Sequence, residues 1–408
     1  MRYLVFLTIL IFISILPSCN SNSDNEQSLK EKANELAQNL IIIDTHIDIP
    51  ARLHTKWKNI SQSTEEGNFD YPRAIKGGLN APFMSIYIPA SYQLTGGAKE
   101  LADTLIDMVN KFAKDWSDKF IIATSPSDII NQFSKTRISI CMGMENGAPI
   151  EGDIKNLKYF YDRGIRYITL THSKNNKICD SSYDDEVTWN GLSPFGIEVV
   201  KEMNRLGIMV DISHVSDSTF YQVIKTTAAP VIASHSSSRY FTPGWQRNMS
   251  DDMIKLLAEN GGVIQINFGS SFLRGDIRQN RTTRGEKINS WLKENNLDKS
   301  SSEAKIFIEN YDREHPRKYA DVKDVADHID HIINLVGIDH LGIGSDFDGV
   351  GDSLPTGLKD VSGYPNLIYE LLKRGYSEND IEKICSENLL RVWKEVEQTA
   401  KRLQLIED

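Results

Sequence analysis

Short apolar runs alternate with amphipathic stretches from about residue 40 almost to the end of the chain. Each run is rich in apolar and often β-branched residues and is bounded by polar or turn-forming residues. That pattern is typical of strands buried on both faces. Eight runs are found, at residues 40–49, 82–88, 138–144, 166–172, 208–214, 230–235, 262–268 and 340–346. They predict a parallel sheet.

Stretches with a helical spacing of apolar residues separate these runs, at 97–116, 126–133, 154–163, 194–206, 216–225, 250–260 and 322–335. Gly164, Gly207, Gly261 and Gly337 follow such stretches, where a left-handed helix cap favours glycine. Strand–helix alternation repeated eight times predicts an α/β fold, a closed (β/α)8 TIM-like barrel. An open, doubly wound sheet is the alternative, but the glycine-rich phosphate fingerprints common in that fold are absent.

Two polar, charged stretches interrupt the alternation, at 50–81 and 270–320. We expect irregular surface insertions there, with one helix around 303–310, framing the mouth of a site. After the last strand, residues 364–373 and 378–405 predict closing helices. Nothing indicates a second globular unit, so residues 39–408 are expected to form a single barrel domain.

The N-terminus has the features of an export signal. Arg2 precedes an apolar run of 13 residues, 4–16, which is short for a membrane span and has the length of a signal-peptide core. It ends in Leu16-Pro17-Ser18-Cys19, which resembles a bacterial lipobox, in which the cysteine is lipidated. We expect a lipoprotein signal peptide over 1–18 and a polar tether over 19–38 after lipidated Cys19. The alternative is a plain cleaved signal peptide with an incidental cysteine.

This reading predicts an exported lipoprotein, anchored by lipid to a membrane of a bacterial cell envelope. The composition is that of an ordinary globular protein: 408 residues, 40% hydrophobic and 25% charged, with a net charge of −10. No basic stripe is present to neutralise phosphates, so a nucleic-acid partner is excluded. The other cysteines, Cys141, Cys179 and Cys385, are odd in number and favour free thiols, although one disulfide pair stays open.

Residues that bind metals or move protons stand at the ends of several apolar runs. These residues are His46, Asp48, Glu145, His172, His214, His235, Asp346 and Asp348. Parallel strands of a barrel all end at one face, so these side chains are expected to converge on one mouth.

Five of them form a candidate site for two metal ions. His46 and Asp48 are two residues apart in a strand and therefore point to the same side. Imidazole suits zinc and similar ions, and His214 and His235 from neighbouring strands complete four ligands. A buried carboxylate such as Glu145 is costly unless it binds a cation, and one placed between two groups can bridge two ions. Such ions activate a water held between them.

Three other residues are candidates for work on the substrate. Asp346 can take a proton from the water and deliver it to a leaving amine. His172 can donate a hydrogen bond to a developing oxyanion, with a satisfied core histidine as the alternative. Arg247 follows the sixth run, and its guanidinium fits a substrate carboxylate as well as it fits a surface salt bridge. Asp348, before a glycine, fits a turn residue.

These residues, in this order, resemble the membrane (renal-type) dipeptidase family of binuclear zinc peptidases. The resemblance covers about residues 40–395. The matching stretches are IDTHID at 43–48, MENG at 144–147, LTH at 170–172 with Asn175, GLSPFG at 191–196, RLGIMVDISHVS at 205–216, PVIASHSS at 230–237, Arg247-Asn248, GSDFDG at 344–349 and ENLLRV at 387–392.

The resemblance implies a TIM-like barrel that hydrolyses dipeptides through a metal-bridging hydroxide, with two Zn2+ ions per subunit. It implies that His46 and Asp48 bind one zinc, that His214 and His235 bind the other, and that Glu145 bridges them. Asp346 would manage protons, His172 would stabilise the tetrahedral intermediate, and Arg247 would hold the C-terminal carboxylate. Members accept D-residues at the C-terminal position, and some open β-lactam rings. Many are dimers, which leaves a homodimer open here.

Two departures bear on the substrate pocket. After residues 265–268 several relatives carry a tyrosine that touches substrate, where this chain has Gly269-Ser270. Asn146 follows Glu145, where relatives often have glycine. Two other functions stay open: a different binuclear-metal amide or lactone hydrolase, acting on β-lactams for example, and a non-catalytic peptide-binding lipoprotein. The second would be expected to have lost its metal ligands.

Overall fold

The computed structural model describes residues 21–407. The predicted signal peptide and Cys19 lie outside the described residues. Among the helices in this part of the chain, none combines the length and the apolar character needed to cross a membrane. The three cysteines within it are buried free thiols.

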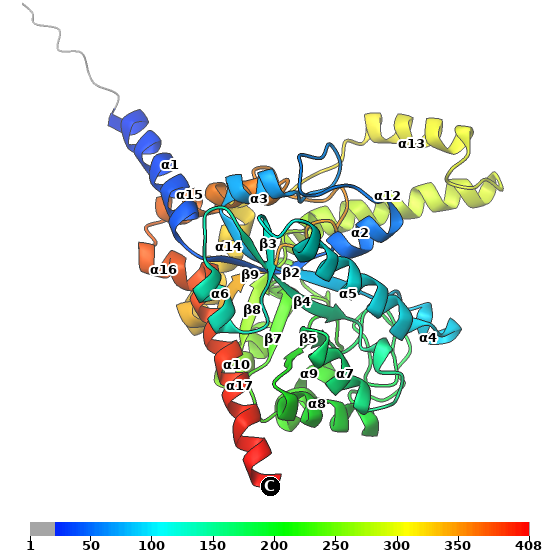
Figure 1. The fold of residues 1–408 in the computed structure, drawn as a ribbon. Helices are drawn as coiled ribbons and strands as arrows, with labels where there is room; N and C mark the ends of the chain where they lie inside the picture. The colour runs from blue at the N-terminus through cyan, green and yellow to red at the C-terminus, as the bar shows by residue number, and fades with distance from the viewer. Residues whose placement is uncertain (1–20, 408) are drawn as a thin grey trace, which may run out of the picture.

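Eight parallel strands form the predicted barrel, in the order in which they occur along the chain (Figure 1). They are β1 (Ile42–Ile47), β2 (Leu79–Tyr87), β4 (Ile138–Glu145), β5 (Ile165–Thr169), β6 (Met209–Asp211), β7 (Ile232–Ser236), β8 (Val263–Ile266) and β9 (Leu341–Ile343). The last strand returns to the first through a parallel bridge between Ile47 and Phe347. The (β/α)8 prediction is confirmed, and the open sheet is not observed. A ninth strand, β3 (Phe120–Ile122), was not predicted and pairs with β4 only.

The strands are almost entirely buried, because helices cover their outer faces and side chains fill the barrel. Inside, Phe83 packs against Tyr167 and Trp393, with ring centres 5.5 and 5.4 Å apart. Trp393 belongs to the C-terminal helix α17 (Asn388–Glu407), which therefore closes the end of the barrel opposite the carboxyl ends of the strands. The predicted closing helices are confirmed.

The outer helices occupy the predicted stretches, and serine caps several of them. Ser193, Ser216 and Ser250 each accept a hydrogen bond from the backbone N–H three residues on. The helices are α5 (Ala98–Asp115), α6 (Pro126–Gln132), α7 (Lys155–Asp162), α8 (Pro194–Leu206), α9 (Asp217–Thr226), α10 (Asp251–Glu259), α14 (Val322–Val336), α15 (Tyr364–Lys373) and α16 (Glu378–Glu382).

Helix α1 (Ser21–Asn39) corrects the prediction of a polar tether over 19–38. Ala33, Leu36 and Ala37 are buried, and α1 packs on α15. These residues are three and four positions apart and so lie on one helix face. That apolar face outweighs the hydrophilic average of the segment, and this part of the chain joins the folded domain.

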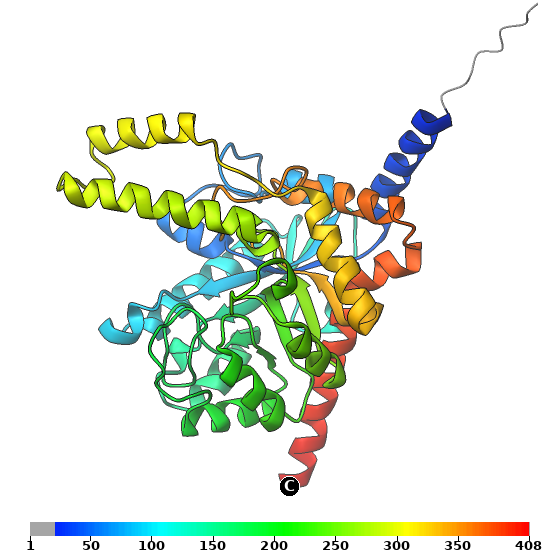
Figure 2. The same cartoon turned by 180° about the vertical axis from the view of Figure 1, so that it is seen from behind.

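The two insertions differ from the irregular structure expected. The first contains α2 (Ile49–Thr55) and α3 (Tyr71–Gly77), and a short α4 (Tyr92–Thr95) follows β2. The second is mostly helical, with α11 (Ser270–Leu273), α12 (Gly275–Glu294) and α13 (Ser302–Glu314). Trp291 and Phe307 stack with ring centres 4.1 Å apart, holding α12 against α13. Figure 2 shows helices α12 and α13, hereafter the arm, reaching out from the barrel.

Candidate metal centre

The barrel brings seven predicted side chains together at the carboxyl ends of its strands. His46 and His235 lie within β1 and β7, and Glu145 ends β4. The others follow strands by one to three residues: Asp48, His172, His214 and Asp346. Because these strands are parallel, all the side chains face one mouth, as predicted.

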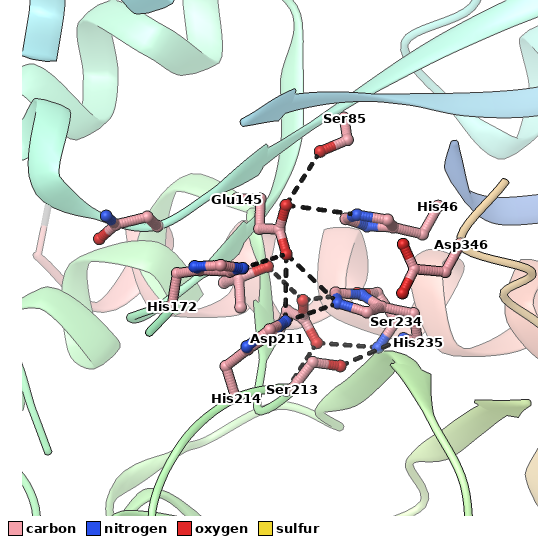
Figure 3. A network of polar contacts seen from close by, with 12 residues as sticks. His46, Ser85, Glu145, His172, Asp211, Ser213, His214, Ser234, His235 and Asp346 are labelled. Carbon is pink, nitrogen blue, oxygen red and sulfur yellow. Dashed lines mark hydrogen bonds and ion pairs between the residues drawn. The ribbon is translucent and has the colours of Figure 1, made fainter. Parts of the chain in front are cut away.

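Glu145 stands at the centre, and its two oxygens face different partners (Figure 3). Oε2 lies 3.4 Å from Nε2 of His46. Oε1 lies 3.1 Å from Nε2 of His214 and 3.3 Å from Nε2 of His235. On the first side, Asp48 Oδ2 is 3.5 Å from Nε2 of His46. One carboxylate therefore contacts donor atoms through each of its two oxygens.

These separations fit metal ligation. Two ligands bound tetrahedrally to zinc at about 2.05 Å are about 3.3 Å apart, since zinc–nitrogen and zinc–oxygen bonds are 2.0–2.2 Å. Nε2 of His46 and Oδ1 of Asp48 are buried and have no hydrogen-bond partner within the described chain. A buried polar atom without a partner is costly, and a cation supplies the partner. The residues present therefore fit a metal centre.

The environment of two histidines fixes the ring nitrogen that faces the centre. Tyr167 donates its hydroxyl hydrogen to the Thr45 carbonyl (3.0 Å), so at His46 it accepts from Nδ1–H (2.8 Å). Ser234 donates to Asp211 (2.6 Å), so it likewise accepts from Nδ1–H of His235 (2.8 Å). Each imidazole then presents the lone pair of Nε2 to the centre, as metal ligation requires.

Sequence reasoning missed these supporting residues. Tyr167, Asp211 and Ser234 lie inside apolar runs, and all three are fully buried. Asp211 gave the one available signal, because an unpaired carboxylate within an apolar strand is costly. It accepts from the backbone N–H of Ser213 and Ser234, from Ser234 Oγ and from Thr169 Oγ1.

The protonation pattern also suits cations. Burial alone would raise the pKa of Glu145, but His46 and the other histidines around it hold that pKa well below its usual range. Burial, together with neighbouring positive groups, lowers the pKa of His214 and His235 well below the usual value. The centre therefore offers an ionised carboxylate beside the neutral imidazoles of His214 and His235. Burial alone would lower the pKa of His46, but Tyr167, Glu145 and Asp48 raise it well above its usual value, so a metal bound there displaces a proton.

Asp346 stands beside these groups in a strained backbone conformation. Its φ of 63° and that of His214, 69°, are left-handed, which is unusual for residues other than glycine. Asn267 Nδ2 donates to Asp346 Oδ2 (2.7 Å). Burial and the Asp48 carboxylate raise the pKa of Asp346 well above its usual value. Asp346 is therefore suited to carry a proton.

His172 and Arg247 also reach the centre. His172 Nε2 is 3.6 Å from Glu145 Oε1, and its ring lies against Tyr87 and His214 at the cavity, so it is not a core histidine. Arg247 is 2% exposed and donates to Ser236 Oγ and to the His235 carbonyl, each at 2.7 Å. The alternative of a surface salt bridge is therefore wrong. Its Nε has no partner within the described chain.

Asp348 is a turn residue, as its position before Gly349 predicted. Its Oδ1 accepts from the Asn68 backbone N–H (2.7 Å), and its Oδ2 is 3.1 Å from Nε of Arg52. Asp348 therefore fastens the β9 loop to the first insertion.

A cavity of about 650 Å3 opens above the centre. Its floor includes Glu145, His172 and Asp346, and Tyr87, Tyr183 and Phe272 supply aromatic walls. The Tyr183 ring centre is 5.7 Å from that of His214. The sequence did not single out Tyr183, which lies in the long polar loop between β5 and α8. Such a cavity admits a small molecule with apolar parts.

The model of the membrane dipeptidase family (peptidase family M19) matches residues 30–407. The chain belongs to this family. An uncharacterised dipeptidase of Schizosaccharomyces pombe, C965.12, is 33% identical over 94% of this chain and 88% of its own length.

Solved structures of M19 and related dipeptidases share the fold. The probable dipeptidase PvdM of Pseudomonas aeruginosa is 27% identical, with a TM-score of 0.79 over 92% of this chain and 100% of its own. Dipeptidase AC, a metallopeptidase of family M19, is 25% identical, with a TM-score of 0.72 over 88% of this chain and 98% of its own. The chain is thus a hydrolase, a dipeptidase of the M19 metallopeptidase family, and the resemblance read from its motifs is confirmed.

Proposed function

We propose that this M19 member is a zinc-dependent dipeptidase that holds two zinc ions. The observation that carries the proposal is the placement of Glu145, whose Oε2 faces His46 while its Oε1 faces His214 and His235. A carboxylate that presents each oxygen to a different set of imidazoles is suited to bridge two ions.

His46, Asp48 and Glu145 would hold one zinc, and His214, His235 and Glu145 the other. Bound there, zinc would supply a water of lowered pKa and a Lewis acid for the carbonyl of the scissile bond. Imidazole nitrogen and carboxylate oxygen are the donor set that zinc prefers over magnesium or calcium.

Arg247 orients the substrate. Nη1 donates to Ser236 Oγ, and Nη2 donates to the His235 carbonyl and lies 3.1 Å from Nε2 of His214, while Nε has no partner within the described chain. A fixed, buried cation with a free N–H fits the C-terminal carboxylate of a dipeptide. A free carboxylate at a set distance from the scissile carbonyl selects dipeptides over longer chains.

His172 and Asp346 act on the reacting atoms. His172 lines the cavity and lies on the other side of Glu145 from His46 (Figure 3), where it can donate a hydrogen bond to the oxygen of the tetrahedral intermediate. Asp346, held by Asn267, takes the proton of the attacking water and delivers it to the leaving amine. The cavity above the centre has a volume of about 650 Å3, and we extend the proposal to L,D-dipeptides.

The sequence of residues 1–19 also supports export and lipidation. We propose that Cys19 carries a lipid that anchors the protein to a bacterial envelope membrane. Metabolic labelling with a radioactive fatty acid should mark the protein, and Cys19→Ser should abolish the label. An unlabelled protein, or an equally labelled variant, contradicts the anchor.

A substrate panel tests the proposed function. The purified full chain, freed of metal by a chelator and then titrated with zinc, should hydrolyse L-Ala-L-Ala and L-Ala-D-Ala. It should leave L-Ala-L-Ala-amide and L-Ala-L-Ala-L-Ala largely intact, because their carboxylate is absent or displaced from Arg247. Faster turnover of a lactone or a β-lactam than of any dipeptide would favour the other binuclear hydrolase. Peptide binding without turnover at any zinc concentration would indicate the peptide-binding lipoprotein.

A further inference from the structure

Unpaired positive charge lies at the rim of the cavity that contains the metal centre. Arg281 of α12, an exposed residue, lines this cavity. It is the one arginine or lysine among the described residues that do so, and the other charged groups there include the carboxylates of Asp48, Glu145 and Asp346. Arg281 comes from the arm, the insertion after β8 that projects past the barrel mouth (Figure 2).

A second, smaller cavity adjoins the first at Arg281. It has a volume of about 150 Å3, and Arg284, Arg317 and Lys318 also line it. These three residues and Arg281 are hereafter the rim cluster. Because Arg281 lines both cavities, a group that extends from the metal centre toward the arm meets this cluster.

The rim cluster has more cations than its neighbouring carboxylates neutralise. Asp312 pairs with Arg284 (2.6 Å) and Arg317 (3.1 Å), and Asp352 pairs with Arg317 (2.9 Å). Across residues 21–407, Arg281 has no ion-pair or hydrogen-bond partner, and neither has Lys318. Partial desolvation and the nearby charge of Arg317 lower the pKa of Arg281. An anion placed here would relieve that repulsion.

Aromatic residues connect the rim cluster to Arg247. The Arg247 guanidinium carbon is 5.1 Å from the ring centre of Phe272, which packs against Trp245 at 4.9 Å. The Arg278 guanidinium carbon is 4.8 Å from the Trp245 ring centre. Arg281 follows Arg278 by three residues, close to one helical turn. Phe272 lines the cavity, so this chain of contacts joins the buried Arg247, beneath Phe272, to the helix that carries Arg281 at the rim.

We propose that the rim cluster selects dipeptides with an acidic C-terminal residue, and that Arg281 receives the side-chain carboxylate. The inference rests on the proposed function for one step, the placement of the C-terminal backbone carboxylate at Arg247. With that carboxylate held deep in the cavity, the side chain of the same residue is the part that extends along Phe272 toward Arg281. The guanidinium fork matches a carboxylate, and the unpaired charge of the cluster adds attraction.

The selectivity is modest in size because Arg281 is exposed. We expect a preference of about twofold to fivefold in kcat/KM for an acidic over an isosteric neutral side chain, mostly through KM. Salt screens exposed charges, so this preference shrinks as ionic strength rises from about 0.02 to 0.5 M.

Kinetics of the zinc-loaded full chain with L-Ala-L-Glu and L-Ala-L-Gln test the proposal, with the D-Glu and D-Gln counterparts in parallel. The readout is the ratio of kcat/KM for Glu over Gln within each variant, so that a general change in activity cancels. Arg281→Glu should lower this ratio to 1 or below. Lys287→Glu, the same charge change on an exposed residue of α12 outside both cavities, should keep it.

A ratio near 1 in the unsubstituted protein, or a ratio that Arg281→Glu leaves unchanged, overturns the proposal. If the charge effect falls on L-Glu-L-Ala against L-Gln-L-Ala instead, the assignment to the C-terminal residue is wrong. Turnover of L-Ala-L-Ala distinguishes a failure of this inference from a failure of the proposed function. If it is hydrolysed without any acidic preference, only this inference fails, and if it is not hydrolysed, the proposed function fails.

Discussion

Replacing Ser234 by alanine should weaken zinc binding without touching a metal ligand. Ser234 Oγ accepts from Nδ1–H of His235 (2.8 Å) and donates to Asp211 Oδ2 (2.6 Å). Ser234→Ala removes the acceptor that fixes the His235 ring. Asp211 keeps its hydrogen bonds from the backbone N–H of Ser213 and Ser234. The perturbation is therefore concentrated on His235.

The magnitude follows from burial. His235 is 1% exposed, so water does not replace the lost acceptor. An unsatisfied buried donor costs about 1–3 kcal/mol. Loss of a group that orients a metal-binding histidine typically costs about 10- to 100-fold in metal affinity, or about 1.4–2.7 kcal/mol. The two magnitudes agree, and we expect a zinc dissociation constant about 10 to 100 times higher.

Competition with a chromophoric chelator measures the dissociation constant, and thermal unfolding of the metal-free protein separates binding from folding. Ser234→Thr retains the hydroxyl and should recover most of the affinity. Ser213→Ala is the matched control, because Ser213 Oγ accepts from the backbone N–H of His235 and does not contact its ring. Unchanged zinc affinity in Ser234→Ala, or an equal loss in Ser213→Ala, would refute the reasoning.

Three other substitutions address the substrate, the second histidine and the pH dependence. Arg247→Lys keeps the positive charge but loses the planar guanidinium that binds a carboxylate through two N–H groups. The kcat/KM for L-Ala-L-Ala should fall about 100-fold, or about 3 kcal/mol. A fall of less than threefold would contradict the role of Arg247 in binding the C-terminal carboxylate. Tyr167→Phe removes the acceptor for Nδ1–H of His46 and should raise the zinc dissociation constant about 10-fold, by the same competition assay. Burial lowers the pKa of His328 from 6.5 to about 4, so the unfolded state binds the extra proton between these values. Stability is complete above pH 6.5 and should fall by about 3 kcal/mol as the pH drops to 4. Denaturant titrations should show that the free energy of unfolding of His328→Gln does not fall in this way between pH 6.5 and 4. An equal fall in the variant would contradict the assignment to His328.

Much of the fold could be predicted because the strands are buried on both faces and read as apolar runs. β3 was missed because it has three residues, two of them only partly buried, and a single neighbour. Helix α1 was missed because the hydrophilic average of the segment hid the spacing of Ala33, Leu36 and Ala37. The arm was expected to be irregular because its helices bury few apolar residues, Ile277 and Ile288 in α12 and Ala304 in α13.

The residues of the site could be predicted where strand ends place them, because parallel topology brings all those ends to one face. The residues that hold the metal-binding histidines in place could not be predicted, since the contact between Tyr167 and His46 joins positions 121 residues apart. Arg281 gave no signal either, because it is one arginine within a polar stretch. Arg281 is assigned a role because it lines two cavities, and those cavities form only when the arm packs beside the barrel.

The central claim is that Glu145 joins two metal ions in one catalytic centre, and zinc content measured together with dipeptidase activity tests it most directly. The purified protein, equilibrated with zinc and freed of excess, should hold two zinc ions per chain and lose all turnover of L-Ala-L-Ala when both are removed. Glu145→Gln should lose zinc and activity together, since each oxygen of Glu145 faces a different set of imidazoles. Full turnover by the metal-free protein, or two firmly held zinc ions in Glu145→Gln, would contradict the account.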